Sequence, residues 1–444
     1  MSCERLEVPM PSPAQLANLA AAQAPAIWLD SALAGHPHAQ ASLLVLQPLR
    51  RWGLSEGKEF RELAAELDHF LHTVPRFDPE GLPFCGGLVG YLAYPSSKPG
   101  AGLPAAQFFA YDTGLALDHL RNQAWVFSLG LEEGGEGSDP AVARRRCEAL
   151  AATLASASAG QGGSFQLRSL RAQISKETYL AKVRDIQERI RRGDCYQVNF
   201  SQGFTARGAW DPADLYLRLR SASPAPQMAF CNLGEAQILS ASPETLLEVE
   251  GEWARSFPIK GTRRRDPDPE LDRRLAEELL RSPKDAAELL MIVDLVRNDL
   301  GRCCRVGSVA VPQLKALDSL PQVHHLYAEV RGRLLAGVGP FQALEKLSPG
   351  GSITGAPKLK AMEIIDALEA VPRGLYTGSL GHAGFDGRAS FNIAIRSALL
   401  RGERLGFSAG GGIVADSDPE LEYEECLHKA RGFFEALGLP DFAP

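Results

Sequence analysis

The sequence lacks the features that mark membrane proteins and nucleic-acid-binding proteins. Its 444 residues contain no apolar run near the roughly 20 residues that a membrane-spanning helix needs. Its 47 Lys and Arg residues are outnumbered by 54 Asp and Glu residues, for a net charge of −7, whereas a dedicated nucleic-acid binder normally has a basic excess. We therefore expect neither a membrane nor a nucleic acid as partner.

Cysteine is scarce and shows no pattern. The eight cysteines include no C-x-x-C pair, so the sequence predicts neither a zinc site nor a disulfide framework. The N-terminal segment MSCERLEVPMPSP carries acids and prolines in place of the apolar core of a secretory signal. Together these features favour a reducing, cytoplasmic setting.

The residues that are present are typical of a globular protein, with 45% hydrophobic and 23% charged. At about 150 residues per domain, the length allows two or three domains or one large one. Gly and Ser cluster at both ends of segment 131–164, which indicates a surface connection. We therefore expect an N-terminal part over residues 1–165 and a C-terminal part over residues 166–444.

The C-terminal part alternates between helical and strand patterns. Apolar spacing or capping signals predict helices over 175–192, 283–300 and 418–437. Alternation or short apolar runs predict strands over 196–201, 237–241, 245–250, 253–258 and 391–400. Because these elements have no regular strand–helix–strand rhythm, we expect an α+β or layered α/β fold.

Three charged residues follow one stripe of the last predicted helix. Glu422, Glu425 and Lys429 are spaced by three and four residues, so they share a face. A solvated face with a Glu425–Lys429 ion pair is one interpretation. A pair of carboxylates that holds a hard cation is the other.

Two acids in the helix over 283–300 raise the same question. Glu288 lies on the face of the apolar Met291 and Leu295, so its carboxylate needs a partner, either a metal ion or an arginine. Asp285 lies three residues after Ser282, where it is either a further oxygen ligand of the metal or, as we expect, the third residue of a capping box.

Several isolated residues remain ambiguous from their spacing alone. Lys260, between a strand-like run and a Gly turn, is either a nucleophile or a surface lysine. Glu244 is an acid at a turn, and His325 is either a proton donor or a core histidine. Arg396 shares a predicted strand face with Asn392 and either binds a carboxylate or lies at the surface.

Two glycine-rich stretches, over 350–355 and 408–412, do not match the phosphate-binding pattern GxxxxGK[ST], so nucleotide binding is not expected. Glycines let backbone N–H groups approach an anion closely, and a carboxylate ligand would suit them; tight turns are the alternative.

Nine ordered segments together resemble the chorismate-utilising enzymes. They are GDCYQVNFS (193–201), SASPE (240–244), PIKGTRRR (258–265), AELLMIVDLVRNDLGR (287–302), VHHL (323–326), GGSITGAPK (350–358), YTGSLG (376–381), FNIAIRSA (391–398) and GGGIVADSDPELEYEE (410–425). The resemblance is dense over about 170–440 and looser before it, where GGLVGYLAY (86–94) also matches. It implies the fold of this family, a large two-sheet sandwich flanked by helices.

Two positions indicate the branch of the family. Gln197 stands where isochorismate and salicylate synthases carry a lysine that activates water, which favours an amine nucleophile. Lys260 gives PIKGT, the form of aminodeoxychorismate synthases, whereas anthranilate synthases usually carry PIAGT. The resemblance therefore implies amination of chorismate at C4 to give 4-amino-4-deoxychorismate, on the route to p-aminobenzoate and folate.

The resemblance also implies a role for each matched residue. Lys260 would attack C2, Glu244 would act as the general acid, and His325 would lie near the ring. Mg²⁺ held by Glu288, Glu422 and Glu425 would bind the ring carboxylate. The further substrate-binding residues would be Gln197, Thr354, Tyr376, Arg396, Gly410, Gly411, Gly412 and Lys429. One departure is Leu289, where the family usually has Asn or His after the metal-binding glutamate.

The N-terminal part carries a second resemblance. AIWLDSA (26–32) is similar to a segment that helps bind tryptophan in this family, so Asp30 and Ser31 either face an amino-acid pocket or form a strand and a turn. The matched segments leave no room for a glutamine amidotransferase domain. We therefore expect ammonia from a separate amidotransferase subunit.

Two alternatives stay open at this point. One is an anthranilate synthase component I, which would retain pyruvate elimination. The other is an inactive, tryptophan-binding regulatory subunit, although the full set of acids with Lys260 and Arg396 argues against it.

Overall fold

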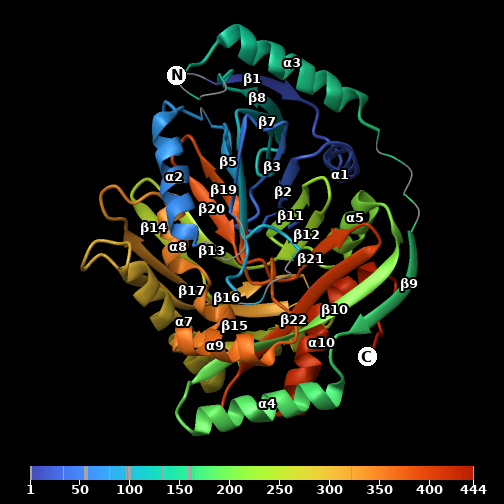
Figure 1. Ribbon diagram of the computed structural model, residues 1–444, viewed down its shortest axis with the longest axis vertical. Coiled ribbons are helices and arrows are strands. Elements are labelled where there is room, and N and C mark those ends of the chain that lie inside the picture. The colour runs from blue at the N-terminus through green and yellow to red at the C-terminus, as the bar shows by residue number, and fades with distance from the viewer. Residues whose placement is uncertain are drawn as a thin grey trace.

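Two large antiparallel sheets form the centre of the molecule in a computed structural model (Figure 1). The structure describes residues 3–33, 35–54, 59–79, 81–96, 98, 102–132, 135, 137–158, 160, 163, 165–321 and 323–443. None of the described helices is both long and apolar enough to cross a membrane.

The first sheet has 12 strands. In spatial order they are β1 (Glu4–Val8), β8 (Gln123–Ser128), β7 (Thr113–Asp118), β3 (Ala41–Leu46), β2 (Ala26–Asp30), β11 (Gln227–Asn232), β12 (Gln237–Ser242), β21 (Ser397–Arg401), β22 (Arg404–Ile413), β10 (Gln197–Trp210) and β18 (Gly355–Ala356), with β9 (Phe165–Ala172) also paired to β10.

The second sheet has 10 strands. They are β15 (Ile259–Arg264), β17 (Val323–Arg333), β14 (Trp253–Ser256), β13 (Thr245–Glu250), β20 (Ala389–Asn392), β19 (Ser379–Gly384), β5 (Gly87–Leu92), β6 (Ala106–Tyr111) and β4 (Arg50–Leu54), with β16 (Ala310–Ser319) also paired to β17.

Helices cover the outer faces of both sheets. They are α1 (Pro13–Ala22), α2 (Phe60–Thr73), α3 (Pro140–Ser156), α4 (Lys176–Arg191), α5 (Pro212–Ala222), α6 (Pro269–Arg281), α7 (Pro283–Gly301), α8 (Pro340–Leu347), α9 (Lys358–Leu368) and α10 (Pro419–Ala436), with the short 3₁₀ helix η1 (Gly351–Ile353). In Figure 1, α3 lies across the top of the view and α4 along the bottom.

The buried apolar residues form two main clusters, one on each side of the first sheet. One cluster joins the two sheets, with Cys231 of β11 facing Tyr91 and Tyr111, and continues to α2, α7 and α8. The other packs the opposite face of the first sheet against helices such as α4, α5 and α10. The resulting layers, helices on a two-sheet sandwich, confirm the predicted fold class.

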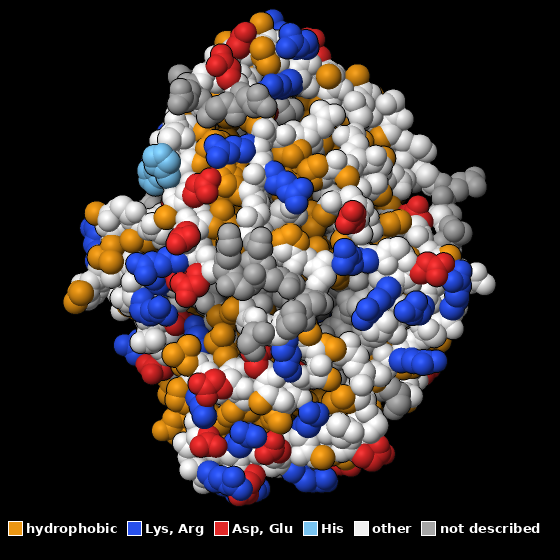
Figure 2. Space-filling view, in the orientation of Figure 1, with side chains coloured by type: hydrophobic (Ala, Val, Ile, Leu, Met, Phe, Trp, Pro, Cys, Tyr) orange, Lys and Arg blue, Asp and Glu red, His pale blue; other side chains and the backbone are white. Residues whose placement is uncertain are grey.

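Strands that are covered on both faces have no polar side. Every residue of β5 and β6 is buried, and all except Gln107 are apolar or glycine, so these strands lack the alternating pattern of a half-exposed strand. By contrast, charged side chains of both signs are interspersed over the face seen in Figure 2.

Both sheets take strands from either side of residue 165. The connection predicted over 131–164 contains α3, and its residues 133, 134, 136, 159, 161, 162 and 164 lie outside the described residues. The division into residues 1–165 and 166–444 stays a prediction about the sequence.

Capping chemistry fixes the ends of the predicted helices. The Ser282 hydroxyl accepts the backbone N–H of Asp285 at 3.2 Å and Pro283 opens α7, as expected. Asp418 caps α10 in the same way. Gly193 ends α4 in the left-handed region at φ +85°, and its N–H donates to Ile190 O at 2.9 Å.

One predicted strand is wrong. The alternating run over 391–400 is not a single strand, because β20 ends at Asn392 and β21 begins at Ser397. Between them the chain passes from the second sheet to the first, and Arg396 takes φ +49°. Crossing between two sheets requires a break that a strand pattern does not reveal.

Candidate active site

The residues picked from the sequence converge on one cleft of about 370 Å³. Strands β10 and β22 of the first sheet, β15 of the second, and helices α7 and α10 form its walls, in the lower half of Figure 1. The predicted residues that line it are Glu244, Lys260, Glu288, His325, Tyr376, Arg396, Gly410, Gly412, Glu422, Glu425 and Lys429. Residues that are far apart in the sequence therefore line one cavity.

Lys260 lies at the centre of this cleft, on β15. Among the described residues its ammonium group has no hydrogen bond and no ion pair. A Cβ atom on Gly412 would lie 3.0 Å from Lys260 Nζ, so glycine leaves the room that the lysine needs. Burial and the nearby Lys429 lower the pKa of Lys260, and Glu288, Glu425 and Glu244 oppose that shift. These conditions favour the neutral, nucleophilic amine.

Glu244 lies at the same part of the cleft, after the end of β12. The Ser352 hydroxyl donates to Glu244 Oε1 at 2.8 Å. Burial raises the pKa of Glu244 to about 7, although the Ser352 bond and Lys260 act in the opposite direction. Near neutral pH this carboxyl group therefore keeps a proton in a large fraction of molecules, as a general acid must.

Polar atoms without partners surround these two residues. Both amide atoms of Gln197, Asn199 Nδ2 and His325 Nε2 are buried and have no hydrogen-bond partner. Gln197 lies on the same side of Gly412 as Lys260, where an added Cβ would come within 2.9 Å of Gln197 Nε2. An unmet buried donor or acceptor costs about 1–3 kcal/mol, so these atoms indicate a ligand or a water molecule in the cleft.

Arg396 and Tyr376 form the cationic end of the cleft. Among the described residues the Arg396 side chain has no ion pair, and burial lowers its pKa. Its backbone is held at φ +49°, a region that costs a non-glycine residue about 1–3 kcal/mol and is enriched at functional sites. A guanidinium fork without a partner, next to the buried Tyr376, suits a carboxylate ligand.

His325 is buried against the cleft on β17. The ring Nδ1 lies 3.0 Å from the Thr262 hydroxyl and 3.3 Å from Gly261 O. Burial, with Arg396 nearby, lowers the pKa of His325 to about 4. The imidazole is therefore neutral at physiological pH.

Three glutamates form the acidic end of the cleft, Glu288 on α7 and Glu422 and Glu425 on α10. Burial raises the pKa of Glu422, and Glu425 and Glu288 add to that shift. The ammonium group of Lys429, 2.6 Å from Glu425 Oε1, lowers the pKa of Glu425. The ion pair expected on the helix face is thus present, but it lies inside the cleft.

The donor chemistry of this end fits a hard cation. A Cβ atom on Gly411 would lie 3.1 Å from Glu422 Oε2 and 3.4 Å from Glu425 Oε1, so the glycine keeps open the space before both carboxylates. Within the described ranges, no group of three or more His, Cys, Asp or Glu side chains is arranged to hold a metal ion by itself. Mg²⁺ commonly takes one or two carboxylates and completes its shell with water and substrate.

The glycines over 410–412 form neither a turn nor a loop. They lie in β22 and pair with residues 199–201 of β10. Gly410 O accepts a hydrogen bond from Lys429 Nζ at 3.0 Å. The missing side chains of Gly411 and Gly412 leave room for the cleft residues, whereas a Cβ on Gly410 would meet the backbone of β10.

Other positions singled out from the sequence lie outside the cleft or have a structural role. Thr354 is fully buried outside the cleft lining, and its hydroxyl donates to Gly350 O at 2.9 Å. Asp30 and Ser31 line a separate cavity of about 210 Å³. Asp285 borders the cleft, but its backbone N–H donates to the cap residue Ser282 and its carboxylate accepts from Arg263 at 3.1 Å. Leu289 is in the core and does not border the acidic end.

Sequence reasoning missed several residues of the cleft. Ser352 lies inside GGSITGAPK, but its bond to Glu244 joins distant segments. Asn199 had a signal, since it shares the polar face of the 196–201 strand with Gln197 and Ser201, and all three are buried. A polar strand face with no solvent contact points to a site.

The chain is similar to several known proteins. A family model described as chorismate binding enzyme matches residues 24–435. Anthranilate synthase component 1 of Thermus thermophilus is 39% identical over 373 residues, which cover 82% of this chain and 80% of that protein. Aminodeoxychorismate synthase component 1 of Klebsiella aerogenes is 38% identical over 437 residues, which cover 93% of each chain.

A solved structure shares the fold. The crystal structure of anthranilate synthase component I from Streptococcus pneumoniae superposes with a TM-score of 0.80 at 29% identity, covering 90% of this chain and 93% of that one.

Proposed function

The chain belongs to the chorismate binding enzyme family, and from this premise we propose that it aminates chorismate at C4 with ammonia to give 4-amino-4-deoxychorismate. The observation that carries the proposal is the presence of Lys260 and Glu244 in the lining of one cleft. Burial lowers the pKa of the lysine and raises that of the glutamate to about 7. The opposite shifts suit a nucleophile and an acid.

The proposed reaction has two displacement steps. The neutral Lys260 amine attacks C2 of the ring, the double bond shifts, and the C4 hydroxyl leaves as water with the proton of Glu244. Ammonia then attacks C4, the C2–N bond breaks, and Lys260 leaves as an amine. Glu244 takes back one proton from the new amino group, so the sum is chorismate plus ammonia to product plus water.

Substrate binding follows from the charges of the cleft. Arg396 and Tyr376 would hold the enolpyruvyl carboxylate, and Lys429 lies at the ring-carboxylate end. Glu288, Glu422 and Glu425 would hold Mg²⁺, which neutralises the charge between these acids and the ring carboxylate. The neutral His325 would lie beside the ring and polarise it without adding charge.

Gln197 supports attack by ammonia, and not by water, on the ring of chorismate. Its amide faces the same side of Gly412 as the Lys260 amine, and an amide does not accept a proton from water at neutral pH. A lysine at this position would supply that base. The chain therefore favours ammonia as the attacking group at C4.

The source of ammonia is proposed to be a separate glutamine amidotransferase subunit. The names of the relatives, each a component 1, imply a further component. The product would feed p-aminobenzoate and folate synthesis. The closest alternative product is anthranilate, because both enzyme types are similar to this chain, but the aminodeoxychorismate synthase match spans more of it.

Product identity tests the proposal. The pure chain is incubated with chorismate, Mg²⁺ and ammonium, and the products are separated by liquid chromatography and identified by mass spectrometry. We expect aminodeoxychorismate, which becomes p-aminobenzoate only after a lyase is added. Anthranilate would contradict the branch assignment, and tryptophan binding with no chorismate turnover would favour a regulatory subunit.

The proposed cation has a test that does not depend on turnover. Mg²⁺ is titrated by calorimetry into the chorismate-bound protein without ammonium. Glu422→Gln should weaken the binding of Mg²⁺ more than Glu424→Gln, whose side chain lies on an exposed face of α10. Equal binding by both variants would remove Glu422 from the site.

A further inference from the structure

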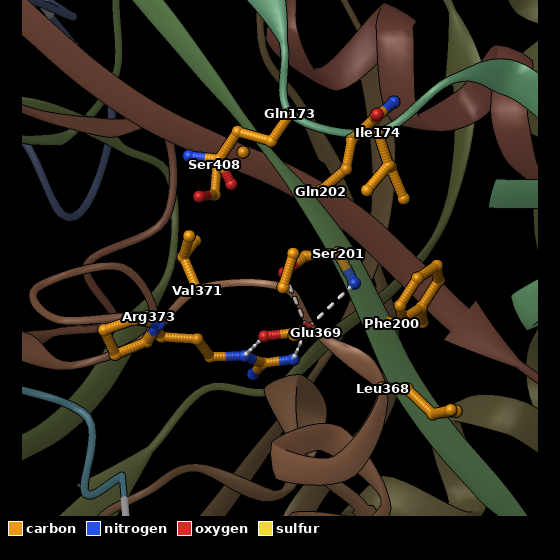
Figure 3. A pocket seen from close by; sticks show the side chains of 13 residues that line it. Gln173, Ile174, Phe200, Ser201, Gln202, Leu368, Glu369, Val371, Arg373 and Ser408 are labelled. Carbon is orange, nitrogen blue, oxygen red and sulfur yellow. Dashed lines mark hydrogen bonds and ion pairs between the residues drawn. The ribbon is translucent and has the colours of Figure 1, made fainter. Parts of the chain in front are cut away.

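A buried ion pair lies directly behind the cationic end of the cleft and takes no part in the proposed chemistry. Arg373, in the loop after α9, pairs with Glu369 at the end of α9, and the two side chains are 2% and 6% exposed. They line a small cavity that shares Ser408 with the cleft. Figure 3 shows Glu369 between Arg373 and Ser201.

The Arg373 guanidinium uses all of its donors. Two N–H groups reach Glu369, with Nε 2.9 Å from Oε2 and Nη2 2.7 Å from Oε1. The other three reach Asn199 O at 2.6 Å, Ile353 O at 2.8 Å and Thr377 Oγ1 at 3.3 Å. Arginine has five N–H donors in a fixed fork, so this side chain is rigidly held.

Each of those three acceptors neighbours or belongs to the cleft wall. Asn199 and Ile353 line the cleft themselves, and Thr377 follows Tyr376. Ile353 also follows Ser352, which bonds Glu244. The guanidinium therefore ties together three segments that meet only in the folded protein: β10, η1 and the loop at 376–377.

Tyr376 is held on a second side by the same group. Arg373 Cζ lies 5.7 Å from the Tyr376 ring centroid and 4.8 Å from that of Tyr94. The next residue, Thr377, is kept at φ +62°, an unfavourable backbone for a β-branched residue. Its N–H donates to Ala394 O at 2.9 Å, which links this loop to the one that carries Arg396.

Glu369 connects the ion pair to strand β10. Its Oε1 accepts the backbone N–H of Ser201 at 3.0 Å and the Ser201 hydroxyl at 2.7 Å. Its negative charge offsets the guanidinium, which would otherwise be an unpaired buried charge. The pair thus stands between β10 and the loop that carries Tyr376.

We propose that Arg373, oriented by Glu369, is a positioning residue that holds Tyr376 in place to receive the substrate carboxylate beside Arg396. The proposal rests on the cleft being the chorismate site, and not on which product is formed. Arg373 does not touch the substrate; it acts through Tyr376.

The first test is the dissociation constant of chorismate, measured by calorimetry with Mg²⁺ and without ammonium. Arg373→Lys keeps the charge opposite Glu369 but loses the planar fork, and it should raise the dissociation constant by roughly 10- to 100-fold. The rate constant at saturating chorismate, measured with ammonium, should change less than about threefold. The control Arg388→Lys alters the pair with Asp386 outside the cleft and should lower only the melting temperature.

A double-mutant cycle identifies the route of the effect. If Arg373 acts through Tyr376, then Arg373→Lys should add little to the binding loss of Tyr376→Phe. Losses that simply multiply would overturn the positioning role, as would an unchanged dissociation constant in Arg373→Lys. Wild-type protein that fails to bind chorismate would instead overturn the proposed function.

A second variant covers the case in which Arg373→Lys does not fold. Thr377→Gly removes one hydrogen-bond acceptor of Arg373, and glycine adopts a backbone φ of +62° without strain. It should fold and still raise the dissociation constant of chorismate by about threefold or more. A folded Thr377→Gly protein with wild-type affinity would contradict the proposal.

Discussion

The cleft and the cavity beside Asp30 both carry polar side chains, but those side chains are satisfied differently. In the cleft, Gln197 and His325 leave buried atoms without partners. In the other cavity, Asp30 Oδ2 accepts from Arg220 at 2.7 Å and from Tyr216 at 2.9 Å, and the Ser31 hydroxyl donates to Ala41 O at 2.7 Å.

The difference distinguishes a site whose polar atoms need a ligand from a cavity whose polar atoms already have hydrogen-bond partners within the protein. Unmet polar atoms lower stability and persist where a ligand or water meets them. Satisfied atoms hold β2 to β3 and to α5 whether or not anything enters the cavity. The cleft is therefore the region where chemistry is expected, and tryptophan binding beside Asp30 stays a prediction.

The largest effect is expected from removing the nucleophile of the cleft. Lys260→Ala should lower the rate of amination by roughly 10³-fold or more, because the covalent step is lost. Intact-protein mass spectrometry with chorismate but no ammonium should show an adduct of chorismate minus water on the wild-type protein only. Lys260→Arg serves as a control that keeps the charge. Unchanged product formation by Lys260→Ala would make the assignment wrong.

Removing the unpaired cation should have the next largest effect. Arg396→Ala loses a charge-assisted, bidentate contact and should weaken chorismate binding by roughly 10- to 100-fold. The measurement is calorimetry of chorismate with Mg²⁺. Arg404→Ala on the exposed end of β22 is the matched control. Equal affinity of both variants would show that the carboxylate binds elsewhere.

The pH dependence of Glu244 provides a third test. Activity needs the protonated acid, so kcat/KM should fall as pH rises through about 7 in wild-type protein when free ammonia is held constant. Bound chorismate is a dianion and should raise the pKa of Glu244 further. In the profile of kcat, the fall in activity should therefore occur at higher pH than in the profile of kcat/KM. A flat profile across this range would contradict the acid role.

The same shift has a consequence for stability. The folded-state pKa of Glu244 lies above its usual 4.5, so the stability present below pH 4.5 is lost as pH rises through about 7. Glu244→Gln does not titrate and should gain roughly 3 kcal/mol relative to wild type across that range. Denaturant unfolding at pH 4.5 and pH 8 measures the difference.

The smallest effect is expected in the second cavity. Ser31→Ala removes a satisfied hydroxyl and should cost about 1 kcal/mol of unfolding free energy while changing chorismate kinetics less than about twofold. The measurement pairs denaturant unfolding with steady-state rates. A large change in chorismate affinity would show that the two cavities are coupled, and the contrast between them would fail.

Local signals in the sequence predicted several helices and strands of the C-terminal part, but by themselves they left the roles of the cleft residues open. The caps at Ser282 and Asp418 place α7 and α10, and the spacing of Glu422, Glu425 and Lys429 places them on one stripe. The resemblance then selected the functional residues among ambiguous ones such as Lys260. Thr354 shows the limit of a motif, since it matches the family segment but lies outside the cleft lining.

The sequence by itself determined the chemical groups of this protein and the helices and strands that carry them, because capping and periodicity act over a few residues. Only the tertiary structure decided which of these polar groups have hydrogen-bond or ion-pair partners. Whether Gln197 finds a partner, whether Glu244 keeps its proton, and whether Arg373 reaches β10 depend on burial and on contacts between segments more than 100 residues apart. No local pattern encodes those distances, because each one is set by two sheets packing together.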